Sequence, residues 1–214
     1  MKYPKIDPRL FSKNRQRFRK QLKPKSIAIF NSNDVMPTSA DGNHPFVQQT
    51  DIFYLSGIDQ EETVLVICPD APDKKQKEIL FVRETNEQIA TWEGHKFTKA
   101  EAREISGIQS VHWTNELNTI LRPLIIESEH IYLNTNEHLR APDVVETRDM
   151  RFLDWCRQTF PLHHYERAAP IMNHLRAVKS PAEIELIKKA CGITDKAFRR
   201  LLGFIKPGVW ECEI

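Results

Sequence analysis

The sequence predicts an α/β protein with a mixed central β-sheet flanked by helices, followed by a linker and one long helix. Short apolar and β-branched runs bounded by turn residues recur along the chain, as is typical of strands. Between them lie segments whose apolar residues recur at helical spacing, and this alternation indicates helices covering a sheet. Hydrophobic residues make up 40% of the 214 residues and charged residues 28%, which is typical of a globular protein.

The stretch 41–68 has the densest apolar pattern. Residues 52–55 form a short aromatic and β-branched run that ends at a glycine, and residues 63–68 form a continuous apolar run. We interpret them as two paired strands. An apolar run without polar alternation suits a strand that is buried on both faces, so this pair is expected near the middle of the sheet. Residues 41–45, which precede it, are typical loop residues.

The other expected elements follow from the same criteria. Thr98 and Glu101, three residues apart, form a capping box at the start of a short helix. Further strands are predicted at residues 26–30, 79–82, 111–113 and 131–133, with the 79–82 strand forming a hairpin with the 63–68 strand, and further helices at 9–23, 115–126 and 147–160.

The carboxyl-terminal part contains the clearest helix start. Ser180, Pro181 and Glu183 supply an N-cap, a proline at the first helical position and a capping-box acid. Residues 167–175, with small residues, a proline and little strand or helix signal, are interpreted as part of a linker. The predicted organisation is therefore a domain at 1–166, a linker at 167–179 and the start of a second domain at 180–214.

Charge and composition argue against nucleic-acid and membrane partners. The net charge is +2, and no apolar run approaches the length of a membrane span. The basic helix at residues 9–23 has an alternative interpretation as an RNA-binding arm, but it lacks aromatic or glycine interleaving, so a solvated face is favoured. The amino terminus lacks the apolar core of a signal peptide, and the four cysteines are scattered, which favours a cytoplasmic location.

Catalytic and metal-binding motifs are not found in the sequence. HExxH, GxSxG, GxxxxGK[ST] and GxGxxG are absent, and the seven glycines form no phosphate-binding loop. The adjacent His163 and His164 lie in a stretch expected to be extended, where neighbouring side chains point to opposite faces and chelate poorly. We therefore expect no catalytic residue and no metal ligand in this chain.

Three segments resemble aminopeptidase P, a group of Xaa-Pro aminopeptidases related to creatinase and prolidase. The first, TSADGNHPFVQQTDIFYLSGIDQEETVLVI, is similar to part of the amino-terminal domain of these enzymes. The second is Trp92 with Gly94, at the same distance from the hairpin as a tryptophan and glycine of the family. The third, LRAVKSPAEIELIKKACGITDKAF followed by IKPGVWECEI, resembles the linker and first helix of their pita-bread catalytic domain.

The resemblance implies a function for the whole protein. Relatives remove an amino-terminal residue that precedes proline, using a pair of metal ions, usually manganese, held by two aspartates, a histidine and two glutamates. All five ligands lie beyond the position matching Ile214, so this chain alone is expected to be inactive and to bind no metal. Relatives are dimers or tetramers, and the amino-terminal domain is expected to support oligomerisation and shape the active-site entrance.

The same resemblance suggests individual site residues. Asp41 matches a loop aspartate that faces the catalytic domain, although capping of the Gly42 turn is an equally good account. Trp92 matches a loop tryptophan that lies against the active site of a neighbouring subunit and would wall the substrate pocket. His44 and His95 are weaker candidates.

The sequence also departs from the family. Relatives often have a tryptophan and an arginine just before the linker proline, where this chain has Ala168 and Ala169. The alternatives are a prolidase restricted to dipeptides, a creatinase, or a catalytically dead peptide- or histone-binding module of the same architecture.

Overall fold

The computed structural model describes residues 5–138, 140 and 144–214. Within them the chain divides into two compact units, Met1–Leu175 and Arg176–Ile214. The first unit contains a sheet in the order β4-β3-β2-β1-β5-β6, in which β2 is antiparallel to both neighbours and every other pair is parallel. The strands are β1 (Ser26–Asn31), β2 (Val64–Ile67), β3 (Glu78–Val82), β4 (Ser110–Trp113), β5 (His130–Leu133) and β6 (His164–Arg167).

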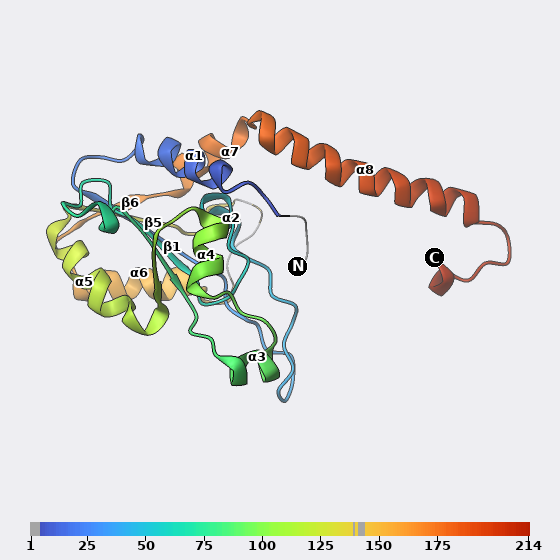
Figure 1. Cartoon of the computed structure of the whole chain (residues 1–214), viewed down its shortest axis with the longest axis horizontal. Coiled ribbons are helices and arrows are strands. Elements are labelled where there is room, and N and C mark those ends of the chain that lie inside the picture. Colours follow the sequence, from blue (N-terminus) through green and yellow to red (C-terminus); the bar gives the residue numbers. More distant parts are fainter. Residues whose placement is uncertain (1–4, 139, 141–143) are drawn as a thin grey trace. The chain divides into compact units, whose positions relative to one another are not determined.

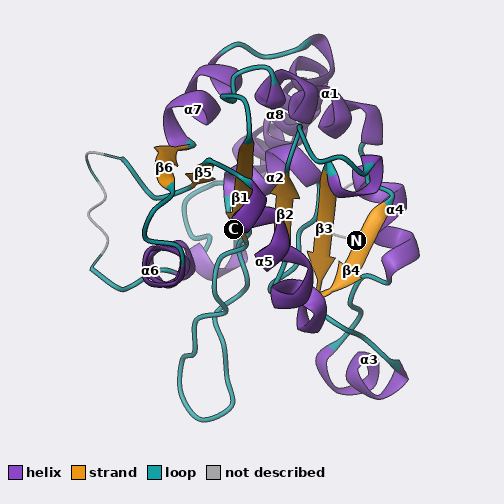
Figure 2. Cartoon of the chain, turned by 90° about the vertical axis from the view of Figure 1, so that its left-hand side faces the viewer, coloured by secondary structure: helices purple, strands orange, loops and turns teal. Residues whose placement is uncertain are grey.

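Helices cover both faces of this sheet, so the predicted fold class is confirmed (Figures 1 and 2). One face packs against α1, α2, α4 and α7 and the other against α5 and α6. The first-unit helices are α1 (Pro8–Arg19), α2 (Thr50–Ser56), α3 (Glu87–Glu93), α4 (Lys99–Ser106), α5 (Leu117–Glu127), α6 (Arg148–Thr159) and α7 (Ala169–Ala177), which extends two residues past the unit boundary.

The central strand β1 shows why the sheet lies in the interior. All six of its residues are buried. Ala28 and Phe30 contact the core cluster under α1 and α2, whereas Ile27 and Ile29 contact the cluster under α5 and α6. A strand that contributes to two cores needs apolar residues on both faces, and in β1 the polar residues Ser26 and Asn31 occur only at its two ends.

Residues 52–55 are helical, so the prediction of a strand there was wrong. They form most of α2, whose N-cap Gln49 accepts hydrogen bonds from the N–H groups of Asp51 and Ile52. Gly57 ends the helix in the left-handed conformation, with a φ of 73°. These caps override the β-propensity of the aromatic and branched residues, because propensity is a weak preference compared with satisfied helix ends.

Residues 167–175 are also not an irregular linker. Arg167 ends β6, which pairs in parallel with β5, and α7 follows at once. Pro170 lies in the first turn of α7, where its missing N–H costs nothing. Met172 and Leu175, three residues apart, are buried in the core. The proline was therefore a helix-start signal rather than a linker signal.

The basic helix α1 is only partly a solvated face. Arg15 is 0% exposed, and its guanidinium donates to the carbonyl groups of Leu55 and Ser106 and to the carboxylate of Glu78. Desolvation lowers the pKa of Arg15, against the opposing effect of Glu78. This side chain therefore connects α1 to the ends of α2 and α4 and to β3.

The second unit contains α8 (Pro181–Phe204), whose predicted start is confirmed. Ser180 and Glu183 form the capping box, and Pro181 occupies the first turn. No residue of α8 is buried in the chain. Several of its large apolar side chains are exposed, namely Ile184, Ile187, Ile193, Phe198, Leu202 and Phe204.

Candidate functional site

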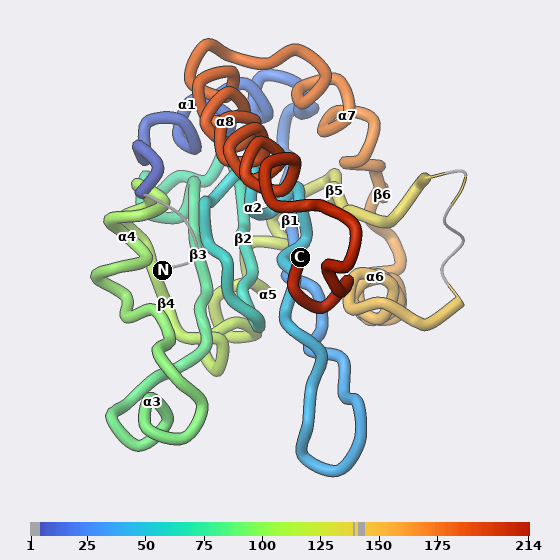
Figure 3. Tube along the Cα trace, turned by 90° about the vertical axis from the view of Figure 1, so that its right-hand side faces the viewer, coloured from blue at the N-terminus to red at the C-terminus, as the bar shows by residue number. Residues whose placement is uncertain are grey.

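Two segments project from one edge of the sheet. Because β1, β3 and β5 are parallel, their carboxyl ends lie at the same edge, where open α/β sheets bind ligands. The loop 32–47 follows β1, and α3 follows β3. Figures 2 and 3 show the loop and α3 as separate projections at this end of the molecule. Together they carry Asp41, His44 and Trp92.

The loop after β1 folds into a tight hairpin. Three backbone hydrogen bonds of 2.9 Å hold it: the N–H of Thr38 donates to the carbonyl of Gly42, the N–H of Gly42 to the carbonyl of Ser39, and the N–H of His44 to the carbonyl of Met36. Asp41 lies exposed at the tip of this hairpin. Within the described residues the hydrogen bonds of the turn join backbone groups, and the Asp41 carboxylate accepts none of them.

Trp92 lies in a helix rather than in the predicted loop. The side chain of Asn86 caps α3 by accepting from the N–H of Ile89, and Gly94 ends it. Trp92 is 83% exposed. Next to it, Glu93 forms an ion pair with Arg83 at 2.6 Å, which ties the end of α3 to the residue that follows β3. An indole held outward on an anchored helix is available to contact a partner surface.

His44 and His95 line different cavities, so the structure does not gather the four predicted residues into one site. His95 lines a cavity of about 420 Å³, together with Phe11, Phe97 and other residues. Its Nε2 is 3.1 Å from a carboxylate oxygen of Glu101, the capping-box acid of α4.

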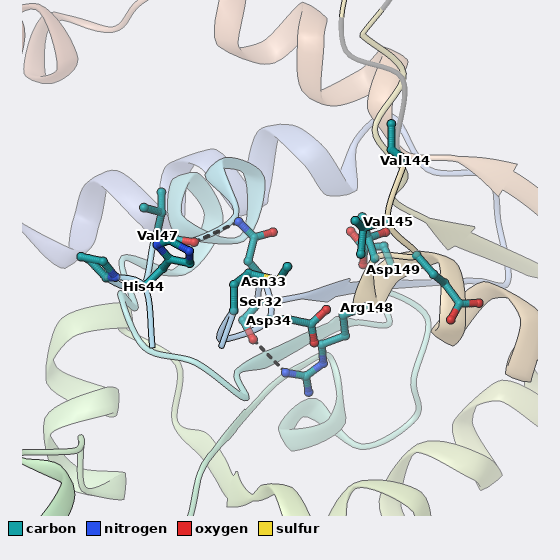
Figure 4. A pocket seen from close by; sticks show the side chains of 13 residues that line it. Ser32, Asn33, Asp34, His44, Val47, Val144, Val145, Arg148 and Asp149 are labelled. Atoms are coloured by element: carbon teal, nitrogen blue, oxygen red, sulfur yellow. Dashed lines mark hydrogen bonds between the residues drawn. The ribbon is translucent and has the colours of Figure 1, made fainter. Parts of the chain in front are cut away.

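His44 borders a cavity of about 500 Å³ between the loop after β1 and the start of α6. Figure 4 shows His44 and Val47 on one side, Val144 and Val145 on the other, and Ser32 and Asp34 between them. The size suits a small ligand. The remaining lining residues are Asn33, Met36, Pro45, Glu146, Thr147, Arg148 and Asp149.

The polar side of this cavity contains a carboxyl group with an unusual pKa. Burial raises the pKa of Asp149 to about 7, and the nearby charge of Asp51 adds to the effect. Asp149 points inward, where its Oδ1 accepts a hydrogen bond of 2.9 Å from the buried Asn31 side chain. Burial also lowers the pKa of Arg148, which donates to the Ser32 hydroxyl over 2.9 Å.

Behind Asp149 lies a second polar pair. The side chain of Asn134, at the end of β5, donates to the Asp51 carboxylate over 3.0 Å. Asn134 is 3% exposed, and its Oδ1 has no hydrogen-bond partner among the described residues. A carboxyl group that titrates near neutral pH beside a cavity can exchange a proton with a ligand there. Sequence analysis missed it because Asp149 looked like any acid in the first turn of a helix.

The described part of the chain does not fit a metal centre. No group of three or more His, Cys, Asp or Glu side chains in it could hold a metal ion. The same residues contain no helix long and apolar enough to cross a membrane.

The family model for the aminopeptidase P amino-terminal domain matches residues 11–132. The chain is 27% identical to the Xaa-Pro aminopeptidase of Escherichia coli over 94% of its own length and 46% of that protein's. It is 23% identical to the Haemophilus influenzae Xaa-Pro aminopeptidase over 98% of its length and 46% of the relative's. It thus spans slightly under half the length of these curated relatives.

Solved structures agree with this match. Zinc-substituted aminopeptidase P of E. coli, in complex with product, superposes with a TM-score of 0.77 at 25% identity, covering 98% of this chain and 48% of the other. An aminopeptidase of Pseudomonas aeruginosa gives a TM-score of 0.81 at 21% identity, over 98% of this chain and 47% of the other, and shows the shared fold. The family match, the sheet order and these superpositions show that the chain belongs to the aminopeptidase P amino-terminal domain family.

Proposed function

We propose that this chain is the non-catalytic amino-terminal part of a metal-dependent Xaa-Pro aminopeptidase. The observation that carries the proposal is the match to Xaa-Pro aminopeptidases along nearly the whole chain. Selective cleavage before proline needs a dedicated enzyme, because proline lacks the backbone N–H and has a fixed φ. The substrates would be peptides with proline at the second position.

In this proposal the chemistry belongs to residues outside the described chain. A related enzyme has been solved in a zinc-substituted form with product bound, which supports a metal-dependent reaction. The described residues offer no cluster that fits a metal ion, so the proposed pair of ions, manganese by family resemblance, would be held elsewhere in the whole protein. Such ions activate water and polarise the scissile carbonyl.

The role proposed for this chain is to border the active-site entrance in a homo-oligomer. Trp92 on α3 and Asp41 on the hairpin tip project from the same edge of the sheet on separate supports. Both side chains are exposed. An exposed, anchored tryptophan is the kind of residue that dominates contacts with a partner. We therefore assign Trp92 to the wall of a substrate pocket formed with another subunit.

The exposed apolar residues of α8 support a larger protein around this chain. Ile187, Phe198 and Leu202 are all exposed in a helix of 24 residues that has no buried residue. A helix with such a stripe is normally covered by apolar partners. We propose that the remainder of a catalytic domain covers it.

We infer a cytoplasmic location. The cysteines of the described residues are all free thiols, which suits a reducing compartment. The Arabidopsis relative is named a mitochondrial peptidase, so fractionation of cells that express the protein is the test. Recovery in an organelle fraction would overturn this inference.

The test uses the whole protein that contains this chain, loaded with manganese, on a tripeptide with proline at position two. Trp92→Ala is expected to raise KM about tenfold, the loss of one aromatic contact. Gln88→Ala, also exposed on α3, is the matched control and should leave KM unchanged.

A folded, metal-loaded protein without cleavage would overturn the proposed function. Equal KM values for both variants would overturn only the role of Trp92. Turnover of dipeptides alone, or of creatine, would point to a prolidase or a creatinase.

A further inference from the structure

A shallow basic hollow lies on the first unit, apart from the candidate site. It has a volume of about 400 Å³ and lies between the carboxyl end of α1, the turn that joins β2 to β3, and the turn that joins α4 to β4. Four of its side chains are cationic, namely Arg19, Lys74, Lys75 and Lys77, and one, Glu78, is acidic. The other lining residues are Ser12, Gly107, Ile108, Gln109 and Ser110.

The negative charge of Glu78 is already neutralised by a buried arginine beneath the hollow. Glu78 Oε2 accepts a hydrogen bond of 2.8 Å from Arg15 Nε, whose side chain is 1% exposed. Arg19, which lines the hollow, approaches the other oxygen at 3.2 Å and is partly exposed. Because the buried Arg15 balances Glu78, the charge of Arg19 adds to the positive potential of the hollow rather than cancelling.

The three lysines have no acidic partners of their own in the described part of the chain. Among the residues that the structure describes, Lys74, Lys75 and Lys77 take part in no ion pair. Their backbone is nevertheless ordered. Asp73 caps the short 3-10 helix Lys74–Gln76 by accepting from the N–H of Lys75, and the carbonyl of Lys77 accepts from the N–H of Cys68. Like charges held together without counter-ions form a ready site for an anion.

We propose that this hollow binds a small polyanion that carries two or more phosphate groups. Four cations around one concave surface exceed what a single monoanion can neutralise. Ammonium groups bind phosphate oxygens as point charges and tolerate varied geometry, so a flexible oligophosphate fits better than a planar carboxylate. The hydroxyl group of Ser12, which also lines the hollow, adds a hydrogen-bond donor. A volume of about 400 Å³ accommodates several linked phosphates.

The test is calorimetric titration of the chain with sodium tripolyphosphate. One site per chain is expected, with affinity that falls at least tenfold between about 50 and about 500 mM NaCl, since exposed charges are screened. Lys74→Ala with Lys75→Ala should weaken binding by about twenty-five-fold, on the basis of about fivefold for each lysine. The matched control is Lys189→Ala with Lys196→Ala on α8, which removes the same charge elsewhere and should change affinity less than twofold.

Each outcome of the titrations either supports or overturns the proposed polyanion site. Absence of binding at low salt would overturn the proposal, as would equal weakening by both double variants, because the attraction would then follow net charge rather than this hollow. Orthophosphate that binds as tightly as tripolyphosphate would overturn the requirement for several phosphates. The affinity for inositol trisphosphate, a soluble lipid headgroup, is then compared with that for tripolyphosphate. The comparison distinguishes a membrane-derived ligand from a free oligophosphate, and site-specific binding of either one supports the site.

Discussion

Replacing Asp149 with asparagine is expected to stabilise the first unit at alkaline pH and to leave its stability nearly unchanged in acid. Burial raises the pKa of this carboxyl group from its ordinary value of 3.8 to about 7. The folded state therefore holds the proton more tightly than the unfolded state does. The contribution of protonated Asp149 to the stability of the folded state is fully present below the pKa that this group has in the unfolded state. It is lost as the pH rises through the pKa that the group has in the folded state.

The magnitude follows from the difference between the two pKa values. About three pH units at about 1.4 kcal/mol each give about 4 kcal/mol as an upper bound on the stability lost by pH 8. The effects that favour the ionised form of Asp149 in the folded state are smaller than the effect of burial. The position of Asp149 in the first turn of α6 favours the anion by about 0.3–1 kcal/mol. The hydrogen bond from Asn31 also favours the anion, and the pKa of about 7 already includes it. The charge of Arg148 also opposes the rise, whereas that of Asp51 adds to it.

The assay is urea unfolding of the wild type and of Asp149→Asn between about pH 4 and about pH 8. The asparagine oxygen can still accept the hydrogen bond from Asn31, so the variant should gain stability relative to the wild type as the pH rises, by about 1–4 kcal/mol at pH 8. Asp154→Asn, at an exposed position on the same helix, should change the free energy of unfolding by less than about 0.5 kcal/mol. A difference between wild type and Asp149→Asn that does not depend on pH would refute the reasoning.

Two further predictions concern the packing around α1. Gly57→Ala should destabilise the protein by about 2–4 kcal/mol, because the new Cβ would lie 2.3 Å from Cε2 of Phe11 and the φ is positive. Gly107→Ala, at the same φ of 73° but with its nearest neighbour 3.7 Å away, should cost only about 1 kcal/mol, and equal losses in thermal unfolding would contradict this account. Arg15→Met should cost about 3–5 kcal/mol in urea unfolding, since Glu78 and two carbonyl groups lose their partner. The exposed Arg9→Met should cost less than about 0.5 kcal/mol, and similar values for both arginine variants would rule out the buried network as the cause.

Much of the fold could be predicted because its signals are local. The capping boxes at Thr98 and Ser180 and the apolar runs of β1 and β2 are readable from a few adjacent residues, and each is confirmed. The prediction of a strand at residues 52–55 was wrong because a glutamine cap is a weak sequence signal, whereas the aromatic run is a strong one.

The candidate site was less accessible to sequence reasoning. The burial of Asp149 depends on Asn31 and Asp51, which are remote in the sequence and meet it only where β1, α2 and α6 converge. The roles assigned to Asp41 and Trp92 came from family resemblance and stay predictions. The structure adds that both are exposed and that Trp92 is held by a helix.

Peptide cleavage by the whole protein tests the central claim most directly. With manganese present, release of the first residue from a peptide with proline at position two is predicted, and none is predicted from this chain of 214 residues alone. Cleavage by the isolated chain, or a folded and metal-loaded whole protein that leaves such peptides intact, would contradict the account.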